Sequence, residues 1–166
     1  MTICVKDGLC VLGDVVDGTM MLGEIGLIVD EEWQKIGASR DYIELDTYCV
    51  MPNHFYGILW LTHEPQSEEH DLTRAKLASS AQLASPLQVR PKGAKSGSLG
   101  AVLGSFKSTT TRRLNRVRGI KGISLWQRNF WERIIRNESE LKATRQYIWN
   151  NPANWLQDEW YAQHKQ

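Results

Sequence analysis

The stretch from Ile43 to Leu61, "IELDTYCVMPNHFYGILWL", decides the fold of this 166-residue chain. β-branched and aromatic residues dominate both of its halves, which is typical of β-strands. Pro52 and Asn53 interrupt the pattern, and both residue types favour turns. The stretch therefore predicts two strands, residues 43–51 and 54–61, separated by a turn.

The second of these strands carries the first candidate for chemistry. Residues two apart on a strand point to the same face, so His54 and Tyr56 share one side of it. Two histidines at that spacing commonly hold a divalent ion, but here a tyrosine takes the second place. Since a lone histidine on a strand is usually structural, the spacing alone leaves the role of His54 open.

The remaining elements follow from periodicity and turn chemistry. Asp7-Gly8 and Asp17-Gly18 are turn signals that predict short strands over residues 2–5 and 9–16. Apolar residues at helical spacing predict helices over residues 22–37 and 99–116, the second beginning after Ser98 as N-cap. Asn137 and Glu140 resemble a capping box, and they predict a last helix over residues 138–150, ended by Pro152.

This order of elements predicts one domain over residues 1–166, of the α+β class. We expect a ferredoxin-like sandwich in which helices pack on one face of an antiparallel sheet. Residues 62–97 are polar, rich in Ser, Ala, Pro and Gly, and have no sustained periodicity. They are predicted to form a flexible insertion.

Composition excludes several classes of protein. The longest apolar runs are far shorter than the roughly 20 residues of a membrane helix, and no signal peptide is recognisable. We therefore expect a cytoplasmic protein. The three cysteines form no CxxC pair, which argues against a zinc ribbon and a disulfide framework.

Charge is strongly segregated along the chain. The net charge is only +1, but residues 72–131 contain 12 Lys and Arg and no Asp or Glu, so the rest carries 8 basic and 19 acidic residues. Such segregation is typical of a surface that binds a polyanion. A solvated basic helix and loop is the alternative, and the length of the acid-free run favours nucleic acid.

The predicted last helix contains the second candidate for chemistry. Tyr147 and Asn151 are four residues apart and therefore lie one turn from each other on the same helix face. A tyrosine near a metal ion can attack phosphorus and form a phosphotyrosine, and an Asn carbonyl is a hard oxygen ligand. Read alone, core packing for Tyr147 and a helix stop for Asn151 are the more common roles of such residues.

Aromatic and basic residues alternate in "LWQRNFWERIIR", Leu125 to Arg136. Aromatic rings can stack unpaired bases while arginines contact phosphates. The candidates for stacking are Trp126, Phe130 and Trp131, and those for phosphate contacts are Arg128, Arg133 and Arg136. For Phe130 and Ile134, burial in the core is the expected role.

Together these pieces resemble the single-tyrosine HUH transposases, in particular the REP-associated tyrosine transposase branch. The resemblance is carried by "YCVMPNHFYGIL", "GSLGAVLGSFKSTTTRRLN", "LWQRNFWERIIRNESEL" and "RQYIWNNPANW", in the family's order. It implies a ferredoxin-like fold, a monomer, and action on single-stranded or hairpin DNA in the nucleoid. It implies transposition through a 5′-phosphotyrosine, with Mg²⁺ or Mn²⁺ as cofactor.

Carried over residue by residue, the resemblance makes Tyr147 the nucleophile. It makes His54 the first histidine of the HUH motif and Asn151 the third metal-ligating side chain, with Tyr56 at the position of the second histidine. With the basic face, it gives the expected DNA contacts as Lys107, Arg112, Arg113, Arg116, Trp126, Gln127 and Arg128.

The chain departs from the family's pattern at three points. Tyr56 replaces a histidine ligand, Arg133 stands where relatives commonly have histidine, and relatives usually have additional residues before the first strand. The departures predict a degenerate or N-terminally truncated copy. A protein that binds DNA hairpins without cutting them is therefore the alternative to an active transposase.

Overall fold

The computed structural model describes residues 1–62, 94–158 and 161. Its central sheet is antiparallel and has the strand order β1-β5-β4. These strands are β1 (Thr2–Cys4), β4 (Ile43–Val50) and β5 (His54–Leu61). The two strands predicted from the stretch Ile43–Leu61 therefore form and pair with each other, with Val50 opposite Phe55 and one register shift between Leu45 and Tyr48.

The outer edge of β1 is covered by part of the segment Leu125–Arg136. Only two isolated bridges form there, Thr2 with Trp131 and Val5 with Trp126, both antiparallel. Counting this segment as a fourth strand gives the order 4-1-3-2 in chain sequence. That is the ferredoxin-like arrangement, and the predicted α+β class is confirmed.

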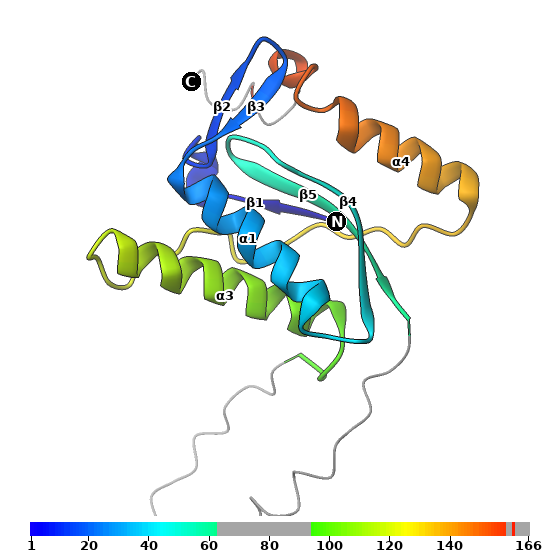
Figure 1. The fold of residues 1–166 in the computed structure, drawn as a ribbon, viewed down its shortest axis with the longest axis horizontal. Coiled ribbons are helices and arrows are strands. Elements are labelled where there is room, and N and C mark those ends of the chain that lie inside the picture. The colour runs from blue at the N-terminus through cyan, green and yellow to red at the C-terminus, as the bar shows by residue number, and fades with distance from the viewer. Residues whose placement is uncertain (63–93, 159–160, 162–166) are drawn as a thin grey trace, which may run out of the picture.

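The three helices do not all lie on one face, as Figure 1 shows. Helices α1 (Glu24–Ala38) and α3 (Leu99–Val117) pack together on one face, as expected. Helix α4 (Glu138–Asn150) packs against β4 and β5 on the opposite face. Its buried residues, Leu141 and Ile148, lie with Tyr56 and Ile58, because alternation along β5 gives both faces of the sheet apolar side chains.

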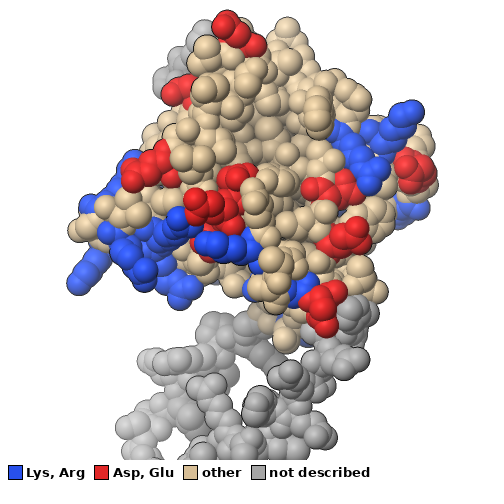
Figure 2. All heavy atoms as spheres, in the orientation of Figure 1, with Lys and Arg blue, Asp and Glu red and all other residues tan. Residues whose placement is uncertain are grey.

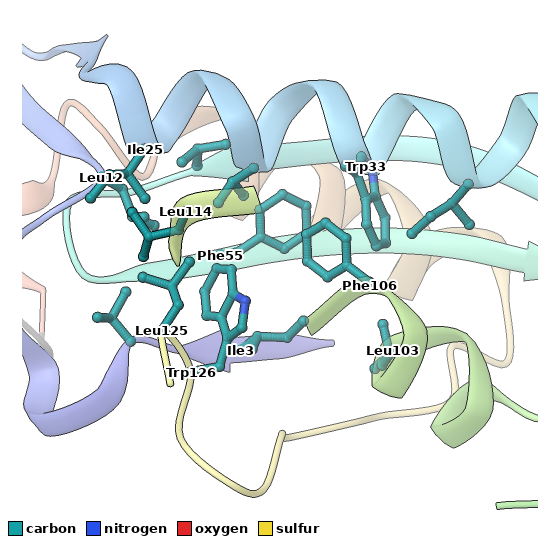
Figure 3. Packing of buried hydrophobic residues seen from close by; sticks show 14 of the residues in the cluster. Ile3, Leu12, Ile25, Trp33, Phe55, Leu103, Phe106, Leu114, Leu125 and Trp126 are labelled. Carbon is teal, nitrogen blue, oxygen red and sulfur yellow. The ribbon is translucent and has the colours of Figure 1, made fainter. Parts of the chain in front are cut away.

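The larger core lies between the sheet and helices α1 and α3 (Figure 3). Trp33 of α1 is fully buried, with ring centroids 4.7 Å from Phe55 and 5.4 Å from Phe106. Gly57 permits this approach, because a Cβ there would lie 2.9 Å from the Trp33 ring. Burial of these aromatic rings contributes much of the free energy that holds α1 and α3 to the sheet.

The N-terminal region differs from its prediction. Lys6–Gly8 forms a 3₁₀ turn, and the strand expected from residue 9 begins only at Gly13. Residues 9–12 lie against the turn between β4 and β5 instead, where the N–H groups of Val11 and Leu12 both donate to the Pro52 carbonyl.

Strand β2 (Gly13–Val16) pairs with β3 (Thr19–Leu22) across the predicted Asp17-Gly18 turn, whose two residues have positive φ. The sequence did not predict β3, which occupies the residues before α1. As a result α1 begins at Glu24, two residues later than expected. A last 3₁₀ turn, η2, spans Trp155–Gln157.

The limits and caps of the last two helices can be compared directly with their prediction. The limits of α3 and α4 agree closely with expectation, and both predicted caps form: the Ser98 side chain accepts from Ala101 N–H, and the Asn137 side chain from Glu140 N–H. The predicted flexible insertion at 62–97 falls mostly on residues 63–93, which lie outside the described residues. Among the described helices, none has the length and apolar character that crossing a membrane requires.

Candidate active site

The candidate site forms where α4 lies over the middle of the central sheet. His54 and Tyr56 point to this face of β5, with their ring centroids 4.6 Å apart. In the sheet, His54 is opposite Cys4 of β1, and Tyr56 is opposite Cys49 of β4. Both rings are therefore held in place by strands on either side.

His54 is buried in a neutral form. Its side chain is 0% exposed, and its Nδ1 lies 2.7 Å from Oδ1 of Asn53. Because that oxygen accepts, Nδ1 carries the proton and Nε2 presents its lone pair. Burial lowers the pKa of His54 to about 3, partly opposed by the Asn151 side chain. The imidazole is thus uncharged at neutral pH, which is the form that binds metal ions.

Tyr56 and Tyr147 meet across the interface between β5 and α4. Their hydroxyl oxygens are 3.0 Å apart, and their rings are edge to face with centroids 5.4 Å apart. Tyr56 is 6% exposed, whereas Tyr147 is 51% exposed. The hydrogen bond therefore joins a buried phenol to one that solvent and a ligand can reach.

Asn151 completes the group, one turn after Tyr147 at the C-terminal end of α4. It is 3% exposed, and its Nδ2 donates to Oδ2 of Asp158 over 3.3 Å. That bond fixes which side of the amide carries the oxygen. The oxygen, Oδ1, is buried and makes no hydrogen bond of ordinary geometry within the described part of the chain. A buried carbonyl oxygen so oriented is suited to a cation.

The structure thus brings together the four residues singled out from the sequence: His54, Tyr56, Tyr147 and Asn151. It adds Asp158, which the sequence did not predict. The one sequence feature that could have indicated Asp158 is its place shortly after the end of the predicted last helix. Across the described residues, no cluster of three or more His, Cys, Asp or Glu could hold a metal ion. A cation here would depend on one imidazole and on oxygen ligands.

An ion pair fixes α4 on this face of the sheet. Arg145 donates to both carboxylate oxygens of Asp46 on β4, over 2.9 and 2.6 Å. Trp60 Nε1 donates to the same carboxylate over 3.1 Å. Asp46 is a charged and largely buried residue of β4, and such a residue usually has a partner in the fold. The sequence could not say which arginine it would be.

We expect this pair to make stability depend on pH. The hydrogen bonds from Arg145 hold the pKa of Asp46 well below its usual range, with burial opposing and Thr47 and Trp60 assisting. A carboxyl with a depressed folded-state pKa stabilises the fold above its unfolded pKa of about 3.9, and this is lost as pH falls toward the folded value. Arg145→Met should therefore destabilise the protein at pH 7, and by progressively less below about pH 4.

Urea unfolding of both proteins across this pH range measures the difference. Arg133→Met is the matched control, because the Arg133 side chain is 78% exposed and its ion pair with Glu140 is longer, at 3.5 Å. It should change stability by less than about 1 kcal/mol at any pH. A pH-independent effect of Arg145→Met would contradict the electrostatic role of the pair.

The predicted DNA-contacting residues divide into two groups. Arg112, Arg116, Gln127 and Arg128 are exposed. A groove of about 290 Å³ runs between α3 and the segment 124–128 and includes Arg112, Gln127 and Arg128 in its lining. A second groove, of about 390 Å³, is lined by Arg112, Arg116 and residues 119–122. Figure 2 shows the basic side chains gathered at the C-terminal end of α3.

The other three predicted residues make internal contacts. Lys107 donates to the carbonyls of residues 127–129 over 2.5–3.3 Å, and burial lowers its pKa. Arg113 pairs with Glu31 and Glu32 of α1 at 2.5 and 3.1 Å. Trp126 is 2% exposed and donates to Thr110 over 2.7 Å. These three hold the basic surface together, and sequence alone does not distinguish them from the exposed group.

Comparison with known proteins gives one clear relative. No family model matches the chain. An uncharacterized protein of Haemophilus influenzae is 30% identical over 166 residues, and the match covers 98% of this chain and 83% of that protein. The chain belongs to the family of this Haemophilus protein.

The fold of this chain is similar to that of a solved structure, a REP-associated tyrosine transposase bound to a REP hairpin. The TM-score is 0.53 and the sequence identity is 17%, over 93% of this chain. The chain spans 65% of the length of that protein. At this identity the comparison establishes the fold, and the resemblance to the transposases seen in the sequence agrees with it.

Proposed function

We propose that this protein is a DNA strand transferase of the single-tyrosine transposase type, acting on single-stranded or hairpin DNA. One observation carries the proposal: Tyr147, a half-exposed residue, lies on the face where buried His54 and Asn151 meet, and its hydroxyl is hydrogen-bonded to that of Tyr56. A nucleophile beside a nitrogen and an oxygen donor fits phosphoryl transfer assisted by a divalent cation.

The comparisons support the proposal at the level of fold. A transposase with a similar fold is bound to a REP hairpin, and the same residue motifs that resemble the REP-associated branch supply the site here. Assignment to that branch, a monomeric state and a place in the nucleoid are part of the proposal.

The donor set fits a Mg²⁺ or Mn²⁺ ion. His54 is neutral and Asn151 Oδ1 is a buried acceptor with no ordinary hydrogen bond in the described residues. These two residues would hold the ion, with the phenol of Tyr56 a poor third ligand. When bound, the ion would polarise a phosphoryl oxygen of the DNA backbone.

The chain's own residues would carry the rest of the reaction. The Tyr147 oxygen attacks a backbone phosphorus and loses its proton as the new tyrosine–phosphate ester forms. The bond from phosphorus to the 3′ oxygen breaks, and that oxygen takes up a proton. The products are a 5′-phosphotyrosine and a free 3′-OH, so the energy of the phosphodiester is kept for rejoining. Tyr56 keeps the attacking hydroxyl over the sheet through its hydrogen bond.

A second candidate function is favoured by Tyr56. With a phenol where the resemblance places an imidazole, the cation would be held by fewer good ligands, and losses of that kind remove most activity. The protein would then bind DNA hairpins without cutting them. Both functions use the exposed arginines of α3 and the segment 124–128, so binding alone does not separate them.

The deciding experiment looks for a covalent adduct. The protein is incubated with end-labelled hairpin DNA carrying single-stranded flanks, in Mn²⁺, and separated on a denaturing gel. A labelled band at the mass of protein plus DNA supports the transferase. If the protein binds the DNA but gives no such band, whether the single-stranded flank is on the 5′ or the 3′ side of the hairpin, the result supports hairpin binding without cleavage.

We also expect DNA affinity to fall steeply with salt. Arginines that neutralise phosphates release counterions, so log K declines linearly with log salt, by about 0.7–0.9 for each phosphate contact. Arg116→Met should reduce the magnitude of this slope by the amount expected for roughly one phosphate contact. Arg113→Met is the matched control, because Arg113 is paired with Glu31 and Glu32. An affinity that does not depend on salt would count against the basic surface as the DNA-binding face.

A further inference from the structure

The segment Leu125–Arg136 contains two tryptophans with opposite surroundings. Trp126 is 2% exposed and belongs to the large core (Figure 3). Trp131 is 68% exposed. If a tryptophan of this segment contacts a ligand, only Trp131 has an available ring face.

The backbone of Trp131 fixes the side of the sheet on which its ring lies. Thr2 N–H donates to the Trp131 carbonyl over 2.8 Å, and Trp131 N–H donates to the Thr2 carbonyl over 2.9 Å. Residues that exchange both hydrogen bonds in an antiparallel pair have side chains on the same face. Since Thr2 is in turn paired with Tyr56, Tyr56, Thr2 and Trp131 form one row across the candidate-site face.

The spacing of this row matches a nucleic-acid strand. Two strand spacings separate Trp131 from Tyr56, which is about 10 Å. That is roughly the length of three stacked nucleotides. Trp131 pairs with β1, which lies on the opposite side of β5 from β4. Helix α4 packs on β4 and β5, so Trp131 lies on the side of Tyr56 away from β4. The segment continues along this face, because Ile135 packs against the cluster that contains Tyr56.

Charged residues of both signs lie near Trp131 in the chain, and the next residue, Glu132, is acidic and exposed. Arg133 follows two residues later and is 78% exposed, and Arg128 precedes it and is also exposed. Ile134, which was expected in the core, is 73% exposed. An exposed indole with an arginine on either side in the chain can bind a single strand, the ring stacking on a base while the guanidinium groups contact phosphates. Glu132, and Glu140 at 3.5 Å from Arg133, offset part of this positive charge.

We propose that Trp131 stacks on an unpaired base of the DNA strand that Tyr147 attacks. The proposal rests on the proposed function and deepens it, because it requires the substrate to be unpaired close to the reactive phosphate. It makes Trp131 a positioning residue: it holds the strand in register with Tyr147 without touching the reacting atoms. Stacking on an aromatic ring tolerates any base, so it selects for an unpaired strand more than for a sequence.

Binding of two labelled DNA hairpins tests this, one with a single-stranded flank and one blunt. Trp131→Ala should weaken binding of the flanked hairpin roughly tenfold and leave binding of the blunt hairpin unchanged. Trp131→Phe should restore most of the affinity and Trp131→Leu should not. The matched control is Trp149→Ala, which removes another tryptophan that is 78% exposed.

The outcomes separate this proposal from the function on which it rests. Equal losses on both hairpins, full affinity of Trp131→Ala for the flanked hairpin, or recovery by Trp131→Leu would each overturn it while DNA binding stands. If the wild-type protein binds neither hairpin, both proposals fail. The Thr2–Trp131 bonds involve only backbone atoms, so the variants should fold, and equal melting temperatures check this.

Discussion

Tyr147→Phe is expected to abolish the covalent protein–DNA adduct completely. The substitution removes one oxygen atom, which is the proposed nucleophile, and no other group at this position can form the ester. The ring of Tyr147 packs edge to face on Tyr56 and the residue is half exposed, so phenylalanine should fit the same place. Denaturing gels of protein incubated with labelled hairpin DNA and Mn²⁺ measure the adduct.

Two comparisons make the result specific. Hairpin affinity of Tyr147→Phe should stay close to that of the wild-type protein, because the exposed arginines of α3 are untouched. Tyr42→Phe removes the hydroxyl of a partly buried tyrosine beside the larger core, and this variant should form the adduct at the wild-type rate. An adduct that persists in Tyr147→Phe would remove Tyr147 from the role of nucleophile.

Tyr56→His is expected to raise the rate of adduct formation by on the order of tenfold or more. An imidazole at this position would point to the same face as His54, whose ring centroid lies 4.6 Å from that of Tyr56. A second imidazole would add a good ligand to His54 and Asn151. The rate should be measured against Mn²⁺ concentration, and the midpoint should move to lower concentration.

The control for this prediction is Tyr56→Phe. It breaks the hydrogen bond to Tyr147 without adding a ligand, so it should leave the Mn²⁺ midpoint unchanged. If Tyr56→His folds normally but reacts no faster than the wild-type protein, the second ligand does not limit activity. The hairpin-binding function would then be the better account of this chain.

Local sequence patterns were enough to predict much of the fold. The turn at Pro52-Asn53 and the strands on either side of it form as expected, since β-branched and aromatic residues fit a half-buried pleated surface. The caps at Ser98 and Asn137 form as well, because a cap involves atoms only a few residues apart. Strand β3 escaped prediction because its four residues, Thr19–Leu22, carry no alternation that separates them from the start of α1.

The candidate site depended on contacts that no local pattern contains. Tyr56 and Tyr147 are 91 residues apart, and Asp46 and Arg145 are 99 residues apart. The side of the sheet on which α4 packs decides whether these pairs meet. All helices were expected on one face, but both faces of β5 carry apolar side chains, so periodicity gave no reason for α4 to pack apart from α1 and α3. The ion pair and the packing of Leu141 and Ile148 hold it on the opposite face.

By itself, the sequence determined the α+β class, the helix limits, the segregation of charge and the residue types that chemistry would need. Only the tertiary structure decided which of those residues share a surface. It buried Trp126 and exposed Trp131, and it paired Arg113 with acids while leaving Arg116 in solvent. The physical reason is that secondary structure follows from atoms a few residues apart, whereas exposure and pairing follow from the packing of distant elements.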